Sequence, residues 1–128
     1  MGRREARREA LHILYQADVS GQDPLTVLAE RDEMEAPVDA FTAALARGVA
    51  THVAEIDALV GEHAQGWTVG RLGGLERCIL RLACYELRYA DDVSDAVAID
   101  EAVEAARALT TPEAARFING VLGGIARS

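Results

Sequence analysis

Apolar residues recur along this chain in stripes of helical period, separated by short polar or glycine-containing breaks. Between Arg3 and Val19 they are spaced three or four residues apart, which is typical of an amphipathic helix. Ser20-Gly21 predicts the end of that helix, because glycine readily adopts the left-handed conformation that closes a helix. Asp23-Pro24 predicts an N-cap followed by proline at the first helical position. A short helix is therefore expected to about Arg31.

Beyond a polar connection, four further helices are predicted at residues 38–63, 75–89, 95–109 and from 112 onward. Gly66-Trp67 is expected to end the long helix, and Gly73-Gly74 to weaken helical structure before the next one. For the last helix, Thr110 with Glu113 fits a capping box and Thr111 fits an N-cap; the sequence allows either. No stretch alternates apolar and polar residues at the period of a strand. The pattern predicts an all-α protein of six to seven helices.

Charge is distributed in blocks along the 128 residues, a length that predicts one domain spanning residues 1–128. The formal net charge of -8 argues, taken as a whole, against a nucleic-acid partner. However, all 13 basic residues are arginines, and four of them lie within the first eight residues. Residues 18–39 and 91–104 each sum to -6. A basic arm suits an anionic polymer, whereas acidic tracts suit a basic partner.

Residues that could carry catalysis or hold a metal are scarce. Cys78 and Cys84 are expected to be small buried apolar residues of a reducing compartment. His52 and His63 are eleven residues apart, which is too far to chelate one ion. Residues 70–74 superficially suggest a phosphate loop, but no strand precedes them and no Gly-Lys-Ser/Thr follows. We therefore expect no enzyme, no metal and no cofactor. Without a signal peptide or a membrane span, the protein is expected to be cytoplasmic.

The N-terminal arginines are the most informative local feature. Arg3, Arg4 and Arg7 lie within about one helical turn, and Arg8 follows directly. Guanidinium groups bind phosphate in a bidentate manner and stack on bases. Arginines at a helix N-terminus also oppose the helix dipole, so their presence indicates a use such as RNA binding. The alternative interpretation is a solubilising start of a helix.

Several sequence blocks, taken together and in order, resemble a known family. They are Arg-Arg-Glu-Ala-Arg at residues 3–7, then residues 10–16, 47–49, 75–87 and 97–104, and Arg-Phe-Ile-Asn-Gly-Val-Leu at 116–122. In composition, order and spacing they are similar to the NusB family of bacterial transcription antitermination factors, over nearly the whole chain. This resemblance implies a fold of two packed helical bundles. It also implies binding of the single-stranded boxA element of ribosomal RNA leader transcripts, together with NusE, a ribosomal protein, and with RNA polymerase.

The resemblance also implies roles for particular residues. The RNA-binding set is Arg3, Arg4 and Arg7 with the adjacent Arg8, and Phe117. The partner-binding set is Tyr15, Glu76, Arg77 and Glu113. From the residues alone, Tyr15 and Phe117 lie on apolar stripes and equally fit core positions.

Two further polar residues have structural interpretations. Glu86 lies inside an apolar helix face and fits a buried ion pair, with Arg77 and Arg81 as the nearest candidates along the helix. Asn119 fits a cap or a bridge to the backbone between helices.

The chain departs from the family pattern at a few positions, and two other functions remain open. Glu5 and Arg8 alter the charge pattern of the arm, Gly73-Gly74 is expected to loosen the partner surface, and Asp100 stands where asparagine is more usual. One alternative is a stand-alone RNA-binding domain related to the N-terminal region of ribosomal RNA cytosine methyltransferases. The other is a homodimeric helical adaptor, in which a dimer would cover the arm.

Overall fold

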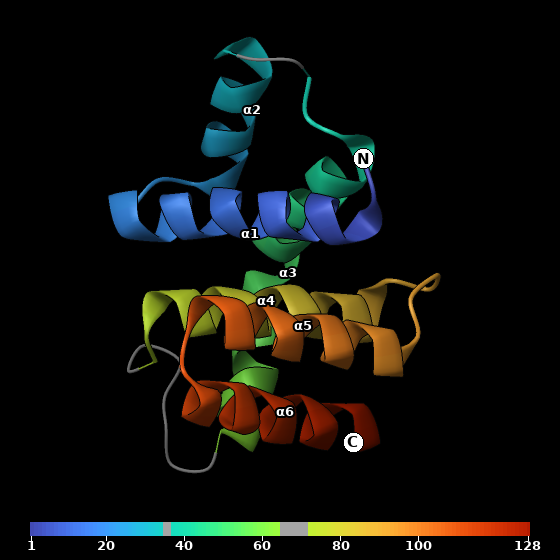
Figure 1. Ribbon diagram of the computed structural model, residues 1–128. Helices are drawn as coiled ribbons and strands as arrows, with labels where there is room; N and C mark the ends of the chain where they lie inside the picture. Colours follow the sequence, from blue (N-terminus) through green and yellow to red (C-terminus); the bar gives the residue numbers. More distant parts are fainter. Residues whose placement is uncertain (35–36, 65–71) are drawn as a thin grey trace.

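The computed structural model describes residues 1–34, 37–64 and 72–128, and these residues form six α-helices without a strand (Figure 1). The helices are α1 (Arg3–Ser20), α2 (Pro24–Met34), α3 (Ala40–His63), α4 (Gly74–Tyr89), α5 (Asp95–Leu109) and α6 (Pro112–Arg127). The all-α prediction is confirmed. The expected helix end at Gly66-Trp67 lies outside the described residues, as does the start of the glycine-containing loop at 70–71.

Local capping chemistry fixes three helix boundaries where the sequence predicted them. Gly21, at φ 72°, closes α1 in the left-handed conformation, and its N–H donates to the carbonyl of Ala17. The carboxylate of Asp23 accepts the N–H of Leu25 at 2.9 Å. At α6 the two possible starts are resolved in favour of Thr111, whose hydroxyl accepts the N–H of Ala114 at 3.1 Å.

Two helix boundaries differ from the expectation. α2 continues past Arg31 to Met34, and the side chain of Asp32 accepts the N–H of Val38 at 2.8 Å just beyond this end. Gly73 is the N-cap of α4, and the helix itself begins at Gly74. The two glycines therefore stand at the helix start, where the destabilising effect of glycine inside a helix does not apply.

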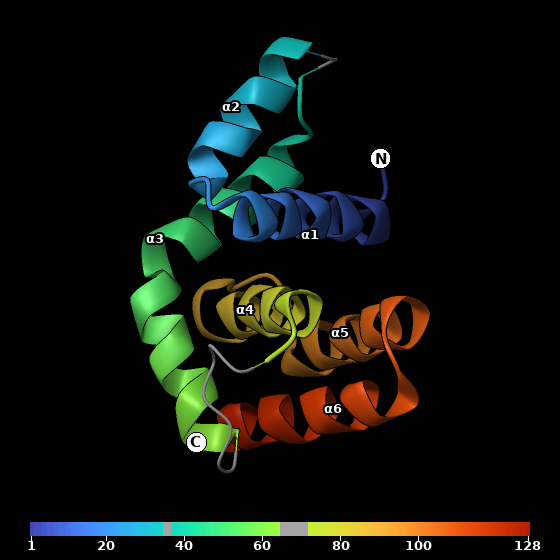
Figure 2. The same ribbon diagram turned by 90° about the vertical axis from the view of Figure 1, so that its left-hand side faces the viewer.

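The long helix α3 connects two bundles, which confirms the predicted arrangement (Figure 2). It is kinked at His52 (φ -107°, ψ 15°). Its N-terminal half packs with α1 and α2 around a small core that contains Ile13 and Val27. Its C-terminal half packs with α4 and α6, around a larger core whose fully buried side chains include Leu80 and Leu122. α1 contributes to both cores, so it joins the two bundles.

The two cysteines are buried, and His52 of the long helix packs against a tyrosine ring. Cys78 and Cys84 are buried and unbonded to each other, and burial raises the pKa of their thiols to about 12 and about 11. His52 stacks on Tyr89 with ring centroids 3.9 Å apart. Among the described residues, no group of histidine, cysteine and acidic side chains is arranged to hold a metal ion. None of the six helices is long and apolar enough to cross a membrane.

Candidate nucleic-acid and protein interface

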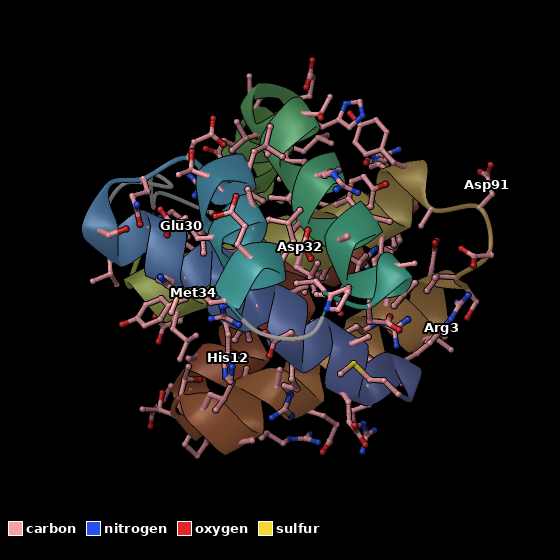
Figure 3. All side chains as sticks on the ribbon, turned by 90° about the horizontal axis from the view of Figure 1, so that it is seen from above. Arg3, His12, Glu30, Asp32, Met34 and Asp91 are labelled. Carbon is pink, nitrogen blue, oxygen red and sulfur yellow. The ribbon has the colours of Figure 1, made fainter. Side chains whose placement is uncertain are left out.

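The arginines at the start of α1 differ in exposure. Arg3 and Arg4 are exposed, Arg8 is half-buried and Arg7 is buried. The helix begins after Gly2, which has no side chain to cap the first N–H groups. Figure 3 shows Arg3 on the side of the molecule where the turn with Asp91 projects. The arm is therefore not a uniform basic surface.

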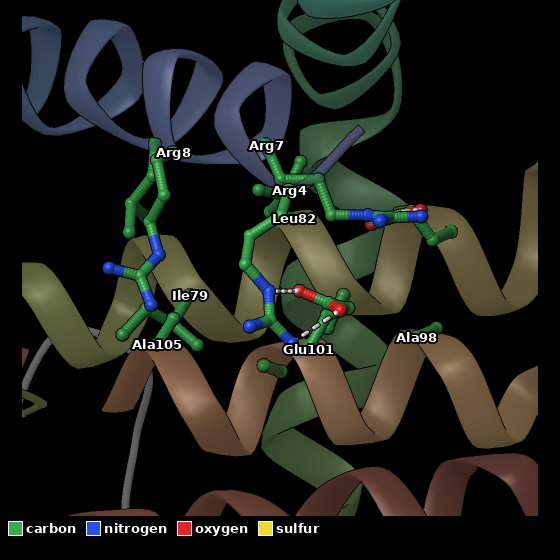
Figure 4. A pocket seen from close by; sticks show the side chains of 12 residues that line it. Arg4, Arg7, Arg8, Ile79, Leu82, Ala98, Glu101 and Ala105 are labelled. Atoms are coloured by element: carbon green, nitrogen blue, oxygen red, sulfur yellow. Dashed lines mark hydrogen bonds and ion pairs between the residues drawn. The ribbon is translucent and has the colours of Figure 1, made fainter. Parts of the chain in front are cut away.

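The two exposed arginines are paired with the acidic tract at residues 91–104. Arg3 Nη2 donates to Asp92 Oδ2 at 2.7 Å. Arg4 donates through Nε and Nη2 to the two carboxylate oxygens of Glu101, both at 3.1 Å (Figure 4). The guanidinium of Arg3 lowers the pKa of Asp92, and the bond to Glu101 raises the pKa of Arg4. The chain thus supplies its own counter-ions to the arm.

Arg7 is buried and forms its hydrogen bonds inside the protein. Its Nε and Nη2 donate to the carboxylate of Glu86 at 3.0 to 3.1 Å, and Glu86 is only 2% exposed. The guanidinium also lies 5.4 Å from the ring centroid of Phe41, within range of a cation–π contact. Arg7 therefore lies in the core, and its guanidinium is less accessible to an external ligand than those of Arg3 and Arg4.

The buried ion pair expected at Glu86 is confirmed, but the expected partners were wrong. At 100° per residue, Arg81 and Arg77 lie about 140° and about 180° around α4 from Glu86. They face a different side, where Arg77 donates to Asp18 at 2.7 Å and Arg81 forms a bidentate pair with Asp57 at 2.8 Å. These bonds tie α4 to α1 and α3.

Arg8 completes the arm beside a small cavity. With Arg4 and Arg7 it lines a space of about 30 Å³ between α1, α4 and α5, floored by apolar residues such as Ile79 and Ala105 (Figure 4). A space of this size holds about one water molecule. It is too small for a nucleotide base, so any RNA contact of the arm lies on the surface.

Tyr15 and Val19 form an exposed apolar pair one turn apart on α1. Tyr15 is 39% exposed and Val19 is 68% exposed, so the core position considered for Tyr15 is wrong. The Tyr15 ring lies over the start of α4, where a Cβ added to Gly74 would come within 3.2 Å of its Cε1 atom. Gly74 therefore allows the close approach of the tyrosine, and the looser partner surface expected from Gly73-Gly74 stays a prediction.

The remaining residues of the predicted partner set lie on the same side of the molecule. Glu76 is half-buried in the first turn of α4, and Glu113 is exposed in the first turn of α6. Figure 1 shows the C-terminal end of α1 and the starts of α4 and α6 at the left of the molecule, with α4 between the other two. Arg77 belongs to this side too, through its bond to Asp18. Phe117, by contrast, is half-buried and packs against the larger core.

A groove of about 750 Å³ lies between α5 and α6 and reaches the first turn of α1. Its polar lining consists of Arg4, Asp100, Glu104, Arg107, Arg116 and Asn119. Arg107 donates to Glu104 at 2.7 Å. The cap or bridge expected for Asn119 is wrong, because its side chain is exposed and bonds to no other described residue. Sequence reasoning missed this groove; the net charge of +2 over residues 105–128 was its only signal.

Comparisons with known proteins agree with this architecture. The family model described as the NusB family matches residues 4–127. Transcription antitermination protein NusB of Saccharopolyspora erythraea is 47% identical over 127 residues, covering 97% of this chain and 86% of that protein. The protein of the same name from Salinispora arenicola is 44% identical over 128 residues, covering 97% and 94%. These names are those of transcription factors, which confirms the expectation of a protein that is not an enzyme.

Two solved structures are similar over almost the whole chain. T. maritima NusB matches with a TM-score of 0.89 and 30% identity, covering 100% of this chain and 92% of that one. A chain in a crystal structure of antitermination factors NusB and NusE in complex with double-stranded RNA matches with a TM-score of 0.84 and 28% identity. It covers 98% of this chain and 96% of its own length.

Proposed function

Because the chain belongs to the NusB family of transcription antitermination proteins, we propose that it binds boxA RNA of ribosomal RNA leader transcripts together with NusE. In this role it joins the antitermination complex on RNA polymerase in the bacterial cytoplasm and supports ribosomal RNA transcription. The observation that carries the proposal is the division of the surface, with exposed arginines at one end of α1 and an exposed apolar pair at the other.

The proposed RNA surface consists of Arg3, Arg4 and Arg8, with Phe117 as a further contact that the family resemblance implies. Arg3 and Arg4 are exposed, and the Arg3 guanidinium lies 4.5 Å over the Phe41 ring, which restricts its position. RNA phosphates can replace the carboxylates on these two arginines, because exposed ion pairs in water are weak. The exchange of one anion for another makes binding by this chain alone modest.

The proposed NusE surface is the side that holds Tyr15, Glu76, Arg77 and Glu113. Tyr15 with Val19 supplies exposed apolar area, and an aromatic anchor of this kind is typical of protein interfaces. The acidic side chains of this set, half-buried Glu76 and exposed Glu113, suit a basic ribosomal protein. NusE bound there would add its own RNA contacts to those of the arm, which compensates for the modest affinity of the arm.

A salt-series titration tests the proposal. A fluorescent boxA-type RNA is titrated with wild type, Arg4→Ala and Arg127→Ala, each with and without NusE. Arg127 is a matched control, because it is exposed at the far end of α6. We expect weak binding alone and tighter binding with NusE. The log–log salt slope should be shallower for Arg4→Ala, by less than the roughly 0.7 of an unpaired arginine, because Glu101 already neutralises Arg4.

Two outcomes contradict the proposal in different ways. Absence of binding with and without NusE would favour the homodimeric adaptor instead. Equal slopes for Arg4→Ala and Arg127→Ala would remove the arm from the RNA surface. Light scattering during the titration reports on a homodimer that covers the arm, because RNA should then convert dimer to monomer.

A further inference from the structure

Asp18, in the last turn of α1, lies between two arginines of α4 at the edge of the proposed NusE surface. Its Oδ2 atom accepts a hydrogen bond from Nη2 of Arg77 at 2.7 Å, and its Oδ1 atom lies 3.8 Å from Nη1 of Arg81. The side chains of Asp18 and Arg77 are only 21% and 17% exposed. Because a partly buried ion pair is screened less than an exposed one, this carboxylate joins the end of α1 firmly to the start of α4.

Arg77 also holds the segment of chain that enters α4. Its Nη1 atom donates to the carbonyl of Leu72 at 3.0 Å, two residues before the helix begins at Gly74. One planar guanidinium therefore connects the last turn of α1 with this segment. Without Asp18, Arg77 would stand four residues from Arg81 on the same helix face, and like charges at this spacing repel each other. We therefore expect the guanidinium of Arg77 to shift when Asp18 is removed.

Three side chains meet at Gly74. A Cβ added there would lie 3.0 Å from Asp18 Oδ2, 3.2 Å from Tyr15 Cε1 and 3.8 Å from Arg77 Nη2. Tyr15 and Asp18 are three residues apart on α1, so their side chains share one face of that helix. The tyrosine ring and the carboxylate thus lie beside the same glycine, and the ion pair that fixes α1 against α4 also fixes the place of the ring.

The neighbouring Gly73 lies against a second residue of the proposed surface. A Cβ at Gly73 would collide with the carboxylate of Glu76, so this side chain is folded over the N-cap of α4. The hydrogen bond from Arg77 to Leu72 holds the chain directly before Gly73. It therefore also fixes the backbone on which Glu76 lies.

We propose that Asp18 is a positioning residue of the proposed NusE surface. Acting through Arg77, it holds α1 against the start of α4 and fixes the ring of Tyr15 beside Gly74 before the partner arrives. A side chain that is already held in place loses less conformational freedom on binding, which strengthens binding. This inference rests on the proposed function and identifies a residue that acts through its neighbours without contacting NusE.

Calorimetric titration of NusE into wild type, Asp18→Ala and Asp57→Ala tests the inference. Asp57 is the matched control, because it forms a bidentate pair with Arg81 at 2.8 Å, is 30% exposed and is not among the groups nearest to Gly74. Each variant loses one partly buried carboxylate, so their melting temperatures should fall by similar amounts. We expect Asp18→Ala to weaken NusE binding about threefold to tenfold and Asp57→Ala to bind as wild type.

A double-mutant cycle with Tyr15→Ala separates positioning from a direct contact and from a general loss of stability. If Asp18 acts through Tyr15, Asp18→Ala should weaken NusE binding in the wild-type background and have a much smaller effect in Tyr15→Ala. Losses that add in Asp18→Ala/Tyr15→Ala would overturn the inference, because independent contributions are additive.

The position of the ring can also be measured without NusE. In the NMR spectrum of the protein alone, a nuclear Overhauser effect should connect the ring protons of Tyr15 with the Cα protons of Gly74 in wild type and in Asp57→Ala. This signal should weaken in Asp18→Ala. An unchanged signal in Asp18→Ala would show that the ring keeps its place without the carboxylate and would overturn the inference.

The two proposals fail separately. If Tyr15→Ala weakens NusE binding but Asp18→Ala behaves as Asp57→Ala, Asp18 is not a positioning residue and the proposed function stands. If wild type does not bind NusE, both proposals are overturned.

Discussion

The buried pair of Arg7 and Glu86 should be the most sensitive ionic contact of the fold. Their side chains are 10% and 2% exposed, and three N–H···O contacts of 3.0 to 3.1 Å join them between α1 and α4. Replacing Arg7 with methionine leaves the Glu86 carboxylate buried without its cation. Removal of one partner of a buried pair costs about 3 to 5 kcal/mol of unfolding free energy.

This loss is large relative to the stability of a domain, which is about 5 to 15 kcal/mol. For a chain of this size, 1 kcal/mol shifts the melting temperature by about 3 to 5 °C. Arg7→Met should therefore melt about 10 to 20 °C below wild type. Arg3→Met, whose partner Asp92 is exposed, should melt close to wild type.

Urea unfolding of a double-mutant cycle decides whether loss of the Arg7–Glu86 pair causes the lower stability of Arg7→Met. The double variant Arg7→Met/Glu86→Leu removes both charges, and replacement of a buried pair by apolar residues is often neutral or stabilising. The double variant should therefore be more stable than either single variant. Single losses that simply add in the double variant would refute a direct coupling between Arg7 and Glu86.

The same variant separates structure from RNA binding. If Arg7 acts only through the fold, Arg7→Met studied well below its melting temperature should keep the salt slope of wild type. A slope reduced by about 0.7 would restore Arg7 to the RNA surface, as the family resemblance implied.

Four further outcomes are expected. Asp92→Asn should tighten RNA binding about twofold to fivefold, because it removes the competing anion from Arg3, whereas Asp91→Asn, with the same charge change, should have a smaller effect in the same assay. In an NMR titration the pKa of Asp92 should lie below its ordinary value near 3.8 and should rise in Arg3→Ala. Because the pKa is lowered in the folded protein, the pair stabilises the fold above the ordinary pKa. This contribution disappears as pH falls through the lowered pKa. Cys78, with a pKa near 12, should resist alkylation at pH 8 until urea unfolds the chain. Tyr15→Ala should weaken NusE binding in a pull-down or calorimetric assay at unchanged melting temperature, and retention of full affinity would exclude this residue from the interface.

Local chemistry determined what could be predicted of the fold. Asp23-Pro24 and Thr111-Pro112 each combine a side-chain acceptor with a fixed proline φ, and both mark the start of a helix in the structure. The partner of Glu86 could not be found in this way, because Arg7 is 79 residues away in sequence. Helical geometry could exclude the nearby arginines of α4, but only the packing of α1 on α4 selects Arg7.

Tyr15 shows a different limit of sequence reasoning. It lies on the same apolar stripe as Leu11 and Leu14, which are buried, so periodicity favours a core position. In the structure its ring lies beside Gly74 at the start of α4, and 39% of the residue stays exposed. The groove residues were missed for a related reason: Arg116 and Asn119 gain significance only when α5 brings Asp100 to the same space.

The pairing of the arm with the acidic tract explains how a chain of net charge -8 can serve an RNA. Arg3 and Arg4 are already neutralised by Asp92 and Glu101. Under the proposed function, RNA would therefore bind by exchange of one anion for another and not by attraction to a bare basic surface. Each phosphate that replaces a carboxylate releases its own counter-ions, but the freed carboxylate regains some from solution. The net ion release per arginine is then below that of an unpaired arginine, which lowers both the affinity and the salt dependence of the chain alone. A second protein that holds the RNA in place shifts this near-balanced exchange toward binding, because it adds contacts without further exchange of anions on the arm.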